Sequence, residues 1–419
     1  MPKRQYLQVS SHSRARALTL LVVVVYACCY VGRLNYPAAM VELLSLGLLT
    51  KGQGGIISTS FFVCYGIGQL INGYVSDRTD AVRQVALGVF GSAIMNLLMG
   101  RLYSFLPMLL TWSLNGYMQS LIWAPAFLVV SQSVPLKWRK HSLMYLNMAP
   151  PAGTVLSFFL SGIILRYLEW QYIFIGGSIV LLTIGAMWLL LSKILYRNAT
   201  EFNPIEREQA EGREKSQISI LHALVISGAV FMVIPTILHG MLRDGITNWL
   251  PTYLSEVFSM RAETAVISSI AVPLINSMGT VGAYAVLRKV KNEFTCTSVL
   301  FALSAGMLLI LIFAGKGSIY ITILSFALVT ACMMGVNTMI CSEIASRFVI
   351  YGKAGGVSGF FDASGYAGTA VSMYLIALIS DRYGWSTTQF IWLGAALIAM
   401  TVCLLGLKRW NSFVASTHT

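Results

Sequence analysis

Long apolar stretches separated by short polar segments run through the whole chain. All twelve stretches given below are 20 or more residues long, enough for a helix to cross the hydrocarbon layer of a bilayer, which takes about 20 residues. The pattern predicts an all-α membrane protein with twelve transmembrane helices. The expected spans are 17–48, 54–75, 81–100, 105–131, 141–166, 171–194, 220–248, 262–287, 295–314, 318–343, 353–379 and 385–407.

The composition agrees with this pattern. Of 419 residues, 56% are hydrophobic and only 11% are charged. Soluble domains carry about 25% charged residues, so this chain cannot cover a water-facing surface of ordinary size. The seven cysteines fall in or beside apolar stretches without metal-ligand spacing, so they are expected to pack, and neither a metal nor a cofactor is expected.

The net charge of +13 follows the topology. Basic residues concentrate in alternate loops, and this asymmetry predicts a multi-pass plasma-membrane protein of bacterial inner-membrane type, with both termini cytoplasmic. The excess charge is therefore no sign of nucleic-acid binding. Examples on the basic side are Lys3, Arg4, Arg14, Arg288, Lys289 and Lys291, against Lys51, Arg101 and Lys316 on the other side.

Residues 195–219 form the one long polar segment, and they divide the spans six and six. The sequences around Trp170 and Trp385, 215 residues apart (385 − 170), resemble each other. The chain is therefore predicted to form two pseudo-symmetric six-helix bundles, 1–194 and 220–419, joined by a cytoplasmic linker. Such parallel repeats are the plan of transporters that rock two bundles about a midplane site.

Two arginines, Arg33 and Arg243, lie inside apolar stretches, 210 residues apart (243 − 33). An arginine at the centre of a membrane helix costs roughly 2.5–3.5 kcal/mol on insertion scales and usually faces a partner or a water-filled cavity. A guanidinium fork binds phosphoryl or carboxylate oxygens in pairs. We therefore expect one arginine from each half to face a shared anion site.

The loop after the second span has the pattern G-x-x-x-D-R-x-x-x-x-R, with Gly73, Asp77, Arg78 and Arg83. The glycine permits close helix approach, and the carboxylate suits a helix N-terminus. The pattern resembles the signature loop of the major facilitator superfamily. The resemblance implies that these four residues form a cytoplasmic gate.

Further motifs resemble the organophosphate:phosphate antiporter family within that superfamily. They are Tyr26-x-x-x-Tyr30-x-x-Arg33-x-Asn35, Asn115-Gly116-x-x-Gln119-x-x-x-Trp123, Arg243-x-Gly245-Ile246-x-x-Trp249-x-Pro251 and Gly365-Tyr366-x-Gly368. The resemblance implies that the two arginines hold the anion and that aromatic side chains line the site. By position, the implied substrate-binding residues are Arg33, Arg243, Tyr26, Tyr30, Trp123 and Tyr366.

Three cationic positions of that family are different here. Leu34 follows the first arginine, Gln69 stands where a lysine is common, and Pro150 replaces a histidine in the segment that begins Leu146-Asn147. Gln69 and Asn147 remain candidate substrate-binding residues. The site is less positive than in the family, which favours a monoanion, a zwitterion or a phosphodiester.

Three titratable residues are candidates for coupling or charge balance. Asp362 could bind a substrate amine or carry a proton, or it could neutralise an arginine of the empty carrier. Asp244 directly follows Arg243, about 100° round the helix, and is expected to be a packing partner rather than a ligand. His239 could titrate, although a lone helical histidine is more often a hydrogen-bonded core residue.

The function predicted from these features is alternating-access transport of a small organic anion, such as an organophosphate or phosphodiester, by phosphate exchange or proton coupling, by a monomer. A proton-coupled carboxylate symporter is the nearest alternative. A transporter-like membrane sensor of a phosphorylated ligand is another. An enzyme is not expected, because the chain has no nucleophile–base set or phosphate-cradling loop.

Overall fold

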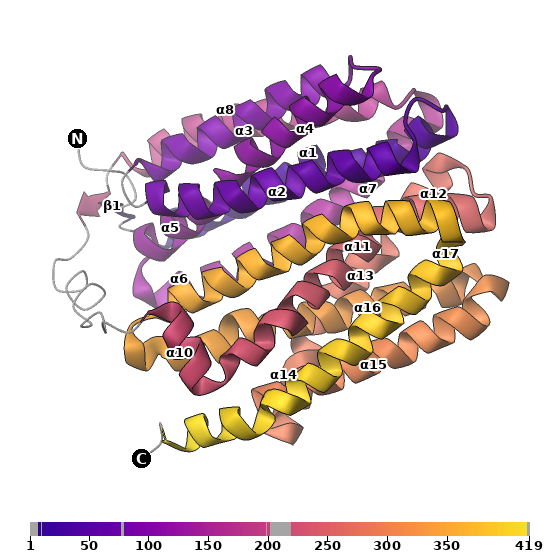
Figure 1. Cartoon of the computed structure of the whole chain (residues 1–419). Helices are drawn as coiled ribbons and strands as arrows, with labels where there is room; N and C mark the ends of the chain where they lie inside the picture. The colour runs from indigo at the N-terminus through magenta and orange to yellow at the C-terminus, as the bar shows by residue number, and fades with distance from the viewer. Residues whose placement is uncertain (1–6, 10, 77–78, 198, 202–218, 417–419) are drawn as a thin grey trace. The chain divides into compact units, whose positions relative to one another are not determined.

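The computed structural model describes residues 7–9, 11–76, 79–197, 199–201 and 219–416, and they are almost entirely helical (Figure 1). In the first half the helices are α1 (His12–Ser45), α2 (Lys51–Ser76), α3 (Ala81–Met99), α4 (Phe105–Ser120), α5 (Trp123–Ser133), α6 (Leu136–Asn147), α7 (Ala149–Tyr167) and α8 (Gln171–Leu195). In the second half they are α10 (Ile220–Ser227), α11 (Val233–Phe258), α12 (Ala262–Ser268), α13 (Ala271–Asn276), α14 (Gly279–Val290), α15 (Glu293–Ala314), α16 (Ile319–Thr338) and α17 (Ala354–Ser416). Short helical turns are η2 (Ala229–Met232), η3 (Gly315–Gly317), η4 (Met339–Ile344) and η5 (Arg347–Tyr351).

Twelve membrane crossings follow from these helices. Ten helical stretches of the described residues are long and apolar enough to span a bilayer. One of them, α17, holds two crossings, because Gly384 breaks its 63 residues with φ 80°. The helices α4 and α5 form a further crossing, interrupted at Leu121 and Ile122. The total of 10 + 1 + 1 confirms the predicted all-helical, twelve-span fold.

The predicted seventh span, 220–248, is wrong at both ends. Residues 220–227 form the separate short helix α10, which ends where Gly228 takes φ 80°, a left-handed conformation that favours glycine. The stretch that spans the bilayer is Ala229–Phe258, which starts nine residues later (229 − 220) and ends ten residues later (258 − 248). Arg243 consequently lies at its middle.

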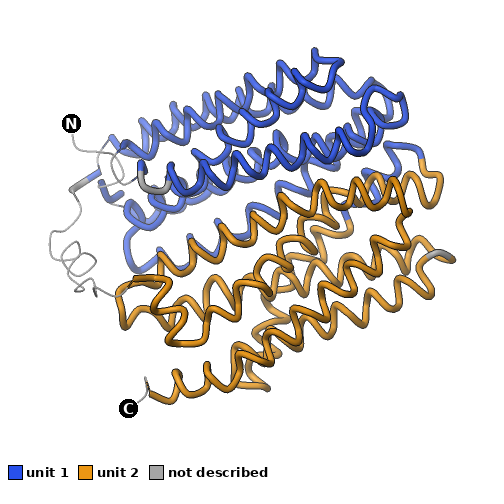
Figure 2. Tube along the Cα trace, viewed as in Figure 1, with its two compact units in different colours: residues 1–212, 261–270 blue, residues 213–260, 271–419 orange. Residues whose placement is uncertain are grey.

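The described chain clusters into two compact units (Figure 2). Unit 1 comprises residues 1–212 with 261–270, and unit 2 comprises 213–260 with 271–419. Within unit 1, Ile267 of α12 packs so closely on Gly162 of α7 that a Cβ at Gly162 would overlap it. Most of the predicted linker, namely 198 and 202–218, lies outside the described residues.

Glycines bring the helices of each unit into close contact. In unit 1, a Cβ at Gly116 of α4 would overlap the backbone oxygen of Phe61 in α2. In unit 2, Cβ atoms at Gly240 and Gly368 would overlap the backbone oxygens of Gly365 and Ile237, so α11 and α17 touch backbone to backbone. Small residues at such crossings are typical of membrane helix packing.

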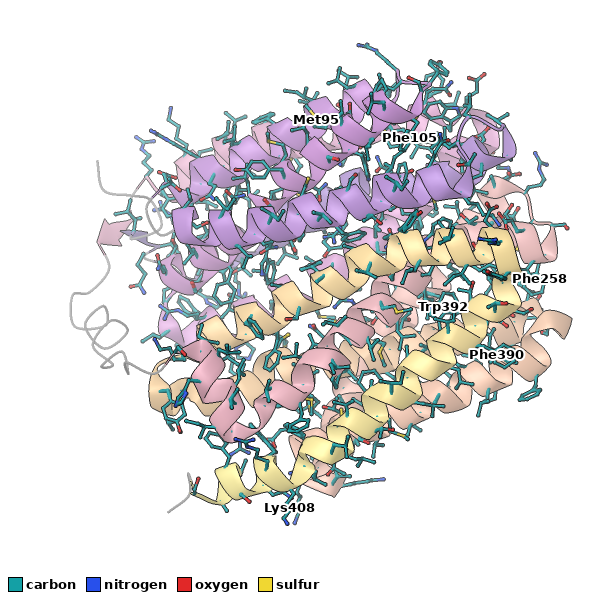
Figure 3. The ribbon with its side chains drawn as sticks, viewed as in Figure 1. Met95, Phe105, Phe258, Phe390, Trp392 and Lys408 are labelled. Carbon is teal, nitrogen blue, oxygen red and sulfur yellow. The ribbon has the colours of Figure 1, made fainter. Side chains whose placement is uncertain are left out.

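Buried and lipid-facing residues alternate around the outer helices. Two residues apart in α17, Trp392 is fully buried whereas Phe390 is more than half exposed (Figure 3). A helix turns about 200° over two residues, so the two side chains lie on opposite faces. The fifth span is divided at Met148: α6 ends at Asn147, and α7 begins at Ala149 with Pro150 and Pro151 in its first turn, where the missing N–H of proline costs no helical hydrogen bond.

A two-stranded antiparallel ribbon is the exception to the helical fold. It joins β1 (Leu7–Gln8) to β2 (Thr200–Glu201) within unit 1. The backbone N–H of Val9 donates to the carbonyl of Ser133 at 3.0 Å, and this ties the ribbon to the end of α5.

Candidate anion-binding site

Arg33 in α1 is 7% exposed and is surrounded by aromatic rings. Its guanidinium carbon lies 4.6 Å from the ring centroid of Tyr65, 5.1 Å from Phe62, and 5.4 Å from each of Tyr30 and Phe61. A cation over a ring face is stabilised by about 0.5–2 kcal/mol, more when water is excluded. These four rings, the ring cage of Arg33, offset part of the cost of burying its charge.

The aromatic residues that the family resemblance implied in the first half lie next to this cage. Tyr26 and Tyr30 are one helical turn apart, with ring centroids 5.6 Å apart in an edge-on arrangement. Trp123, the first residue of α5, stacks at a tilt on Tyr26 with centroids 4.9 Å apart. Tyr26, Tyr30 and Arg33 follow the i, i+4, i+7 spacing of one helix face. The structure therefore brings Arg33, Tyr30, Tyr26 and Trp123 together in one continuous group.

Gln69 and Asn147 have different surroundings. The side-chain amide of Gln69 donates to the hydroxyl of Tyr65 at 2.6 Å, so it reaches Arg33 through one ring of the cage. Asn147 is exposed, and its amide donates to the carbonyl of Leu143 one turn earlier in α6. The structure does not bring Asn147 into the Arg33 group.

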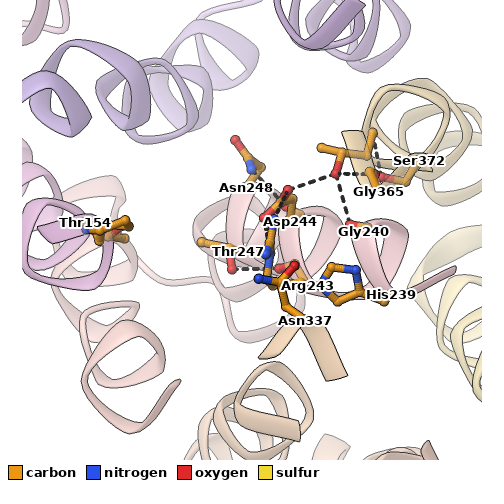
Figure 4. Close-up of polar contacts among 12 residues, drawn as sticks. Thr154, His239, Gly240, Arg243, Asp244, Thr247, Asn248, Asn337, Gly365 and Ser372 are labelled. Atoms are coloured by element: carbon orange, nitrogen blue, oxygen red, sulfur yellow. Dashed lines mark hydrogen bonds and ion pairs between the residues drawn. The ribbon is translucent and has the colours of Figure 1, made fainter. Parts of the chain in front are cut away.

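In unit 2, Arg243 forms a two-pronged ion pair with its neighbour Asp244 (Figure 4). Nε donates to Oδ1 at 2.9 Å and Nη2 donates to Oδ2 at 3.1 Å. The hydroxyl of Thr369 in α17 also donates to Asp244 Oδ2, at 2.8 Å. The expectation that Asp244 is a packing partner rather than a ligand did not specify its partner, and the structure pairs it with Arg243 although neighbouring residues lie about 100° apart on a helix.

The other predicted residues of unit 2 lie around this pair. Asp362 and Tyr366, both half-buried in α17, interact electrostatically with Arg243. His239, one turn before Arg243, is 2% exposed. Its Nδ1 lies 3.2 Å from the carbonyl of Thr236, while its Nε2 has no hydrogen-bond partner among the described residues.

The gate residues are only partly described. Asp77 and Arg78 lie outside the described residues, and Gly73 belongs to α2. Arg83 is exposed in the first turn of α3, where its backbone N–H donates to the capping carboxylate of Asp80 at 3.1 Å. Among the described residues, no group of three or more His, Cys, Asp or Glu side chains could hold a metal ion.

Sequence reasoning missed Phe61, Phe62, Tyr65 and Thr369. A signal for two of them was present: Phe61, Tyr65 and Gln69 are spaced i, i+4, i+8, which places them on one face of α2. Thr369 carries no such signal, because threonine is common in membrane helices and commonly bonds to its own backbone.

Distant relatives match this chain in sequence over most of their length. The "Membrane sensor protein UhpC" of Salmonella typhimurium is 23% identical over 401 residues, covering 88% of this chain and 86% of the relative. The "Glycerol-3-phosphate transporter" of Bacillus subtilis is 23% identical over 420 residues, covering 94% and 91%. The sequence resemblance to organophosphate:phosphate antiporters is thus confirmed at the level of distant relatives.

Solved structures show the same fold. A bacterial homologue of the human lysosomal transporter Spinster, in an inward-facing and occupied conformation, superposes with a TM-score of 0.78 at 12% identity. The match covers 96% of this chain and 99% of that one. The model of the Major Facilitator Superfamily matches residues 22–361, about four fifths of the chain. The chain therefore belongs to the Major Facilitator Superfamily, whose members are multi-pass secondary transporters rather than enzymes.

Proposed function

We propose that this chain carries a small organic anion across the plasma membrane by alternating access, with Arg33 and Arg243 as its anion-binding groups. The observation that carries the proposal is the environment of these two buried charges. Each lies in a membrane-spanning helix, and each is held by side chains rather than left to lipid. A buried ionisable residue in a membrane helix is by default a functional group.

The substrate class follows from the charge balance. Asp244 neutralises Arg243 directly, and Asp362 lies within electrostatic range of it. Arg33 is instead stabilised by rings, and the neighbouring Gln69 is uncharged. With two carboxylates around Arg243, a monoanion, a zwitterion or a phosphodiester suits this arginine better than a dianionic phosphate ester. Distant relatives are named "Glycerol-3-phosphate transporter" and "Probable hexose phosphate transport protein", which supports a ligand that carries a phosphoryl group.

We assign the coupling of transport to a proton to the region around Arg243 in unit 2. Asp362 is the proposed proton carrier, and the half-satisfied ring of His239 is a second proton-accepting group beside Arg243. Proton symport and phosphate exchange are both compatible with these groups. Tyr26, Tyr30, Trp123, Tyr366, Gln69 and Asn147 remain the proposed substrate-lining residues. Gly73, Asp77, Arg78 and Arg83 remain the proposed cytoplasmic gate of a monomer with both termini in the cytoplasm.

Transport in proteoliposomes tests the proposal. Uptake of labelled phosphate, a phosphodiester and a carboxylate is measured with phosphate inside the vesicles and, separately, with an inward proton gradient. We expect uptake of at least one anion by the wild type. Arg33→Ala and Arg243→Ala should each abolish it, whereas Arg166→Ala, which removes an exposed arginine at the end of α7, should not. Normal transport by either substrate-arginine variant would refute the site.

A sensor is the second candidate, because one of the relatives is named as a membrane sensor protein. A sensor binds its ligand without carrying it. Thermal stability of the purified protein against the same anions separates the two functions, since a ligand that binds the folded state raises its melting temperature. A melting shift that disappears in Arg243→Ala, together with no uptake or exchange in vesicles, would identify a sensor.

A further inference from the structure

Four buried polar side chains in α3 and α4 converge on the backbone of α1 beside Arg33. They are Ser92 and Asn96 in α3, and Asn115 and Gln119 in α4, here called the polar bracket. Three are fully buried and Gln119 is 5% exposed. Polar groups cannot be left unpaired at such depth without a cost in free energy, so their hydrogen bonds show what they hold.

Three members of the bracket donate to backbone carbonyl groups of α1. The amides of Asn96 and Asn115 both donate to the carbonyl of Gly32, at 3.1 and 3.0 Å. The amide of Gln119 donates to the carbonyl of Cys29 at 3.0 Å. These carbonyls lie one residue and four residues before Arg33.

The bracket is also bonded internally. Ser92 donates from its hydroxyl to the side-chain oxygen of Asn115 at 2.6 Å, and the amide of Gln119 donates to that hydroxyl at 3.1 Å. Asn96 additionally accepts from the amide of Asn35 at 2.6 Å, a side chain two residues beyond Arg33. Each amide is therefore oriented by a second partner, and the bracket is not free to follow a rotation of α1.

Pro37 explains why α1 needs such support. Proline has no N–H, so the carbonyl of Arg33, four residues earlier, receives no hydrogen bond from the helix ladder, and the ring crowds it. Helix α1 is thus weakened within one turn of its arginine. Gly32 allows the bracket to approach there: a Cβ would lie 3.0 Å from the amide nitrogen of Asn96 and 2.5 Å from Leu181 Cδ1.

We propose that the polar bracket positions Arg33 for anion binding by fixing the rotation of α1 about its axis. The bonded carbonyls belong to residues next to Arg33 on the helix: Cys29 lies one turn before it and Gly32 about 100° round the axis from it. Tyr26, Tyr30 and Arg33 share a face, as their ring contacts show. A rigid helix cannot turn these side chains without moving the carbonyls that α3 and α4 hold. This inference rests on the proposed function, since it assigns Ser92, Asn96, Asn115 and Gln119 as positioning residues of the same site.

The experiment compares bracket variants with a matched buried amide. Asn115→Leu and Gln119→Met remove the donors but keep the size of the side chains. Asn72→Leu is the control, because Asn72 is similarly buried and its amide donates to the hydroxyl of Ser120 in α4 at 2.7 Å rather than to the backbone of α1. Ser92→Ala is a milder variant that leaves all three carbonyl bonds in place, in case the amide variants do not fold.

Concentration dependence of labelled phosphate exchange is measured for each variant in proteoliposomes. We expect the half-saturating concentration to rise about three- to tenfold in Asn115→Leu and Gln119→Met, and less in Ser92→Ala, with the maximal rate nearly retained. Asn72→Leu should leave the half-saturating concentration unchanged. An unchanged value in the bracket variants, or an equal rise in Asn72→Leu, overturns the inference.

A second measurement needs no ligand and separates this inference from the proposed function. Arg33→Gln is combined with Asn115→Leu and with Asn72→Leu, and melting temperatures of the purified proteins are compared. If the bracket holds Arg33 in its ring cage, the double variant Arg33→Gln with Asn115→Leu loses less melting temperature than the sum of the two single variants. The double variant Arg33→Gln with Asn72→Leu should lose the full sum. Additive losses in both pairs refute the bracket. If the wild type does not transport but the melting-temperature losses of Arg33→Gln and Asn115→Leu are less than additive, the proposed function is refuted and the bracket is not.

Discussion

Replacing Asp244 by asparagine should make the protein bind anions more tightly. Asp244 occupies the Nε–Nη2 edge of the Arg243 guanidinium through two charged hydrogen bonds of 2.9 and 3.1 Å, so an anion that binds this edge displaces its carboxylate. Hydrogen bonds to charged groups contribute about 1.5–3 kcal/mol each. Asparagine offers one acceptor oxygen to the fork and turns its other group, an N–H donor, toward the cation. At least one of the two bonds is therefore lost.

The loss of one such bond sets the size of the effect. A competing interaction weaker by about 1.5–3 kcal/mol corresponds to roughly tenfold to a hundredfold tighter anion binding, since each 1.4 kcal/mol is a factor of ten. Both side chains of the pair are 17% exposed, so residual screening by water favours the lower figure. The ligand-free variant should in turn be less stable, because Arg243 loses its counter-ion in a buried setting.

Thermal unfolding of purified protein over a phosphate or phosphodiester titration measures both effects together. We expect Asp244→Asn to melt at a lower temperature than the wild type without ligand and to gain more on adding anion. Asp381→Asn, which neutralises an exposed carboxylate of unit 2, should match the wild type in both respects. Weaker anion binding by Asp244→Asn would refute the reasoning, because it would make Asp244 a helper of binding rather than a competitor.

Two further predictions concern stability. Gly116→Ala should destabilise the protein by about 1–3 kcal/mol and lower its melting temperature, because the new Cβ would overlap the backbone of Phe61. Gly306→Ala is the control and should melt like the wild type, because the space at its Cβ is open. Glu293→Ala should also lower the melting temperature, because Glu293 is buried and forms an ion pair with Arg347 at 2.7 Å. The expected loss of stability is about 1–3 kcal/mol. An unchanged melting temperature would show that this ion pair does not stabilise the folded protein.

Hydrophobic patterning predicts the spans well because a bilayer imposes a length on them. A helix that crosses needs about 20 apolar residues, and every backbone polar group must be bonded within it. The seventh span fails for a local reason. Residues 220–227 are as apolar as the helix that follows, so apolarity alone cannot tell a short separate helix from the crossing. Gly228, with its positive φ, marks the break, but many glycines elsewhere in this chain sit within helices.

The candidate site is harder to read from the sequence than the fold. The spacing of Tyr26, Tyr30 and Arg33 predicts a shared helix face, and their contacts agree. Phe61 and Tyr65 look in the sequence like any aromatic residues of a membrane span, and only the tertiary packing that brings α2 to Arg33 of α1 places their rings over a guanidinium. The pairing of Arg243 with Asp244 depends on a rotamer of a long side chain, which helix geometry does not fix.

The two arginines are stabilised by different means, and the difference bears on how an anion would bind. Ring faces stabilise Arg33 by about 0.5–2 kcal/mol each. The rings carry no net charge, so an approaching anion does not have to displace a negatively charged group from this guanidinium. At Arg243 an anion competes with a carboxylate that Thr369 also holds, at 2.8 Å. Arg33 should therefore supply most of the net affinity. Arg243 should supply selectivity instead. A ligand that displaces Asp244 leaves its carboxylate without the arginine. That carboxylate must then take a proton, keep only its bond to Thr369, or pair with a cationic group of the ligand. A zwitterionic phosphodiester could provide that last partner, whereas a dianion would add a second negative charge beside Asp244 and Asp362.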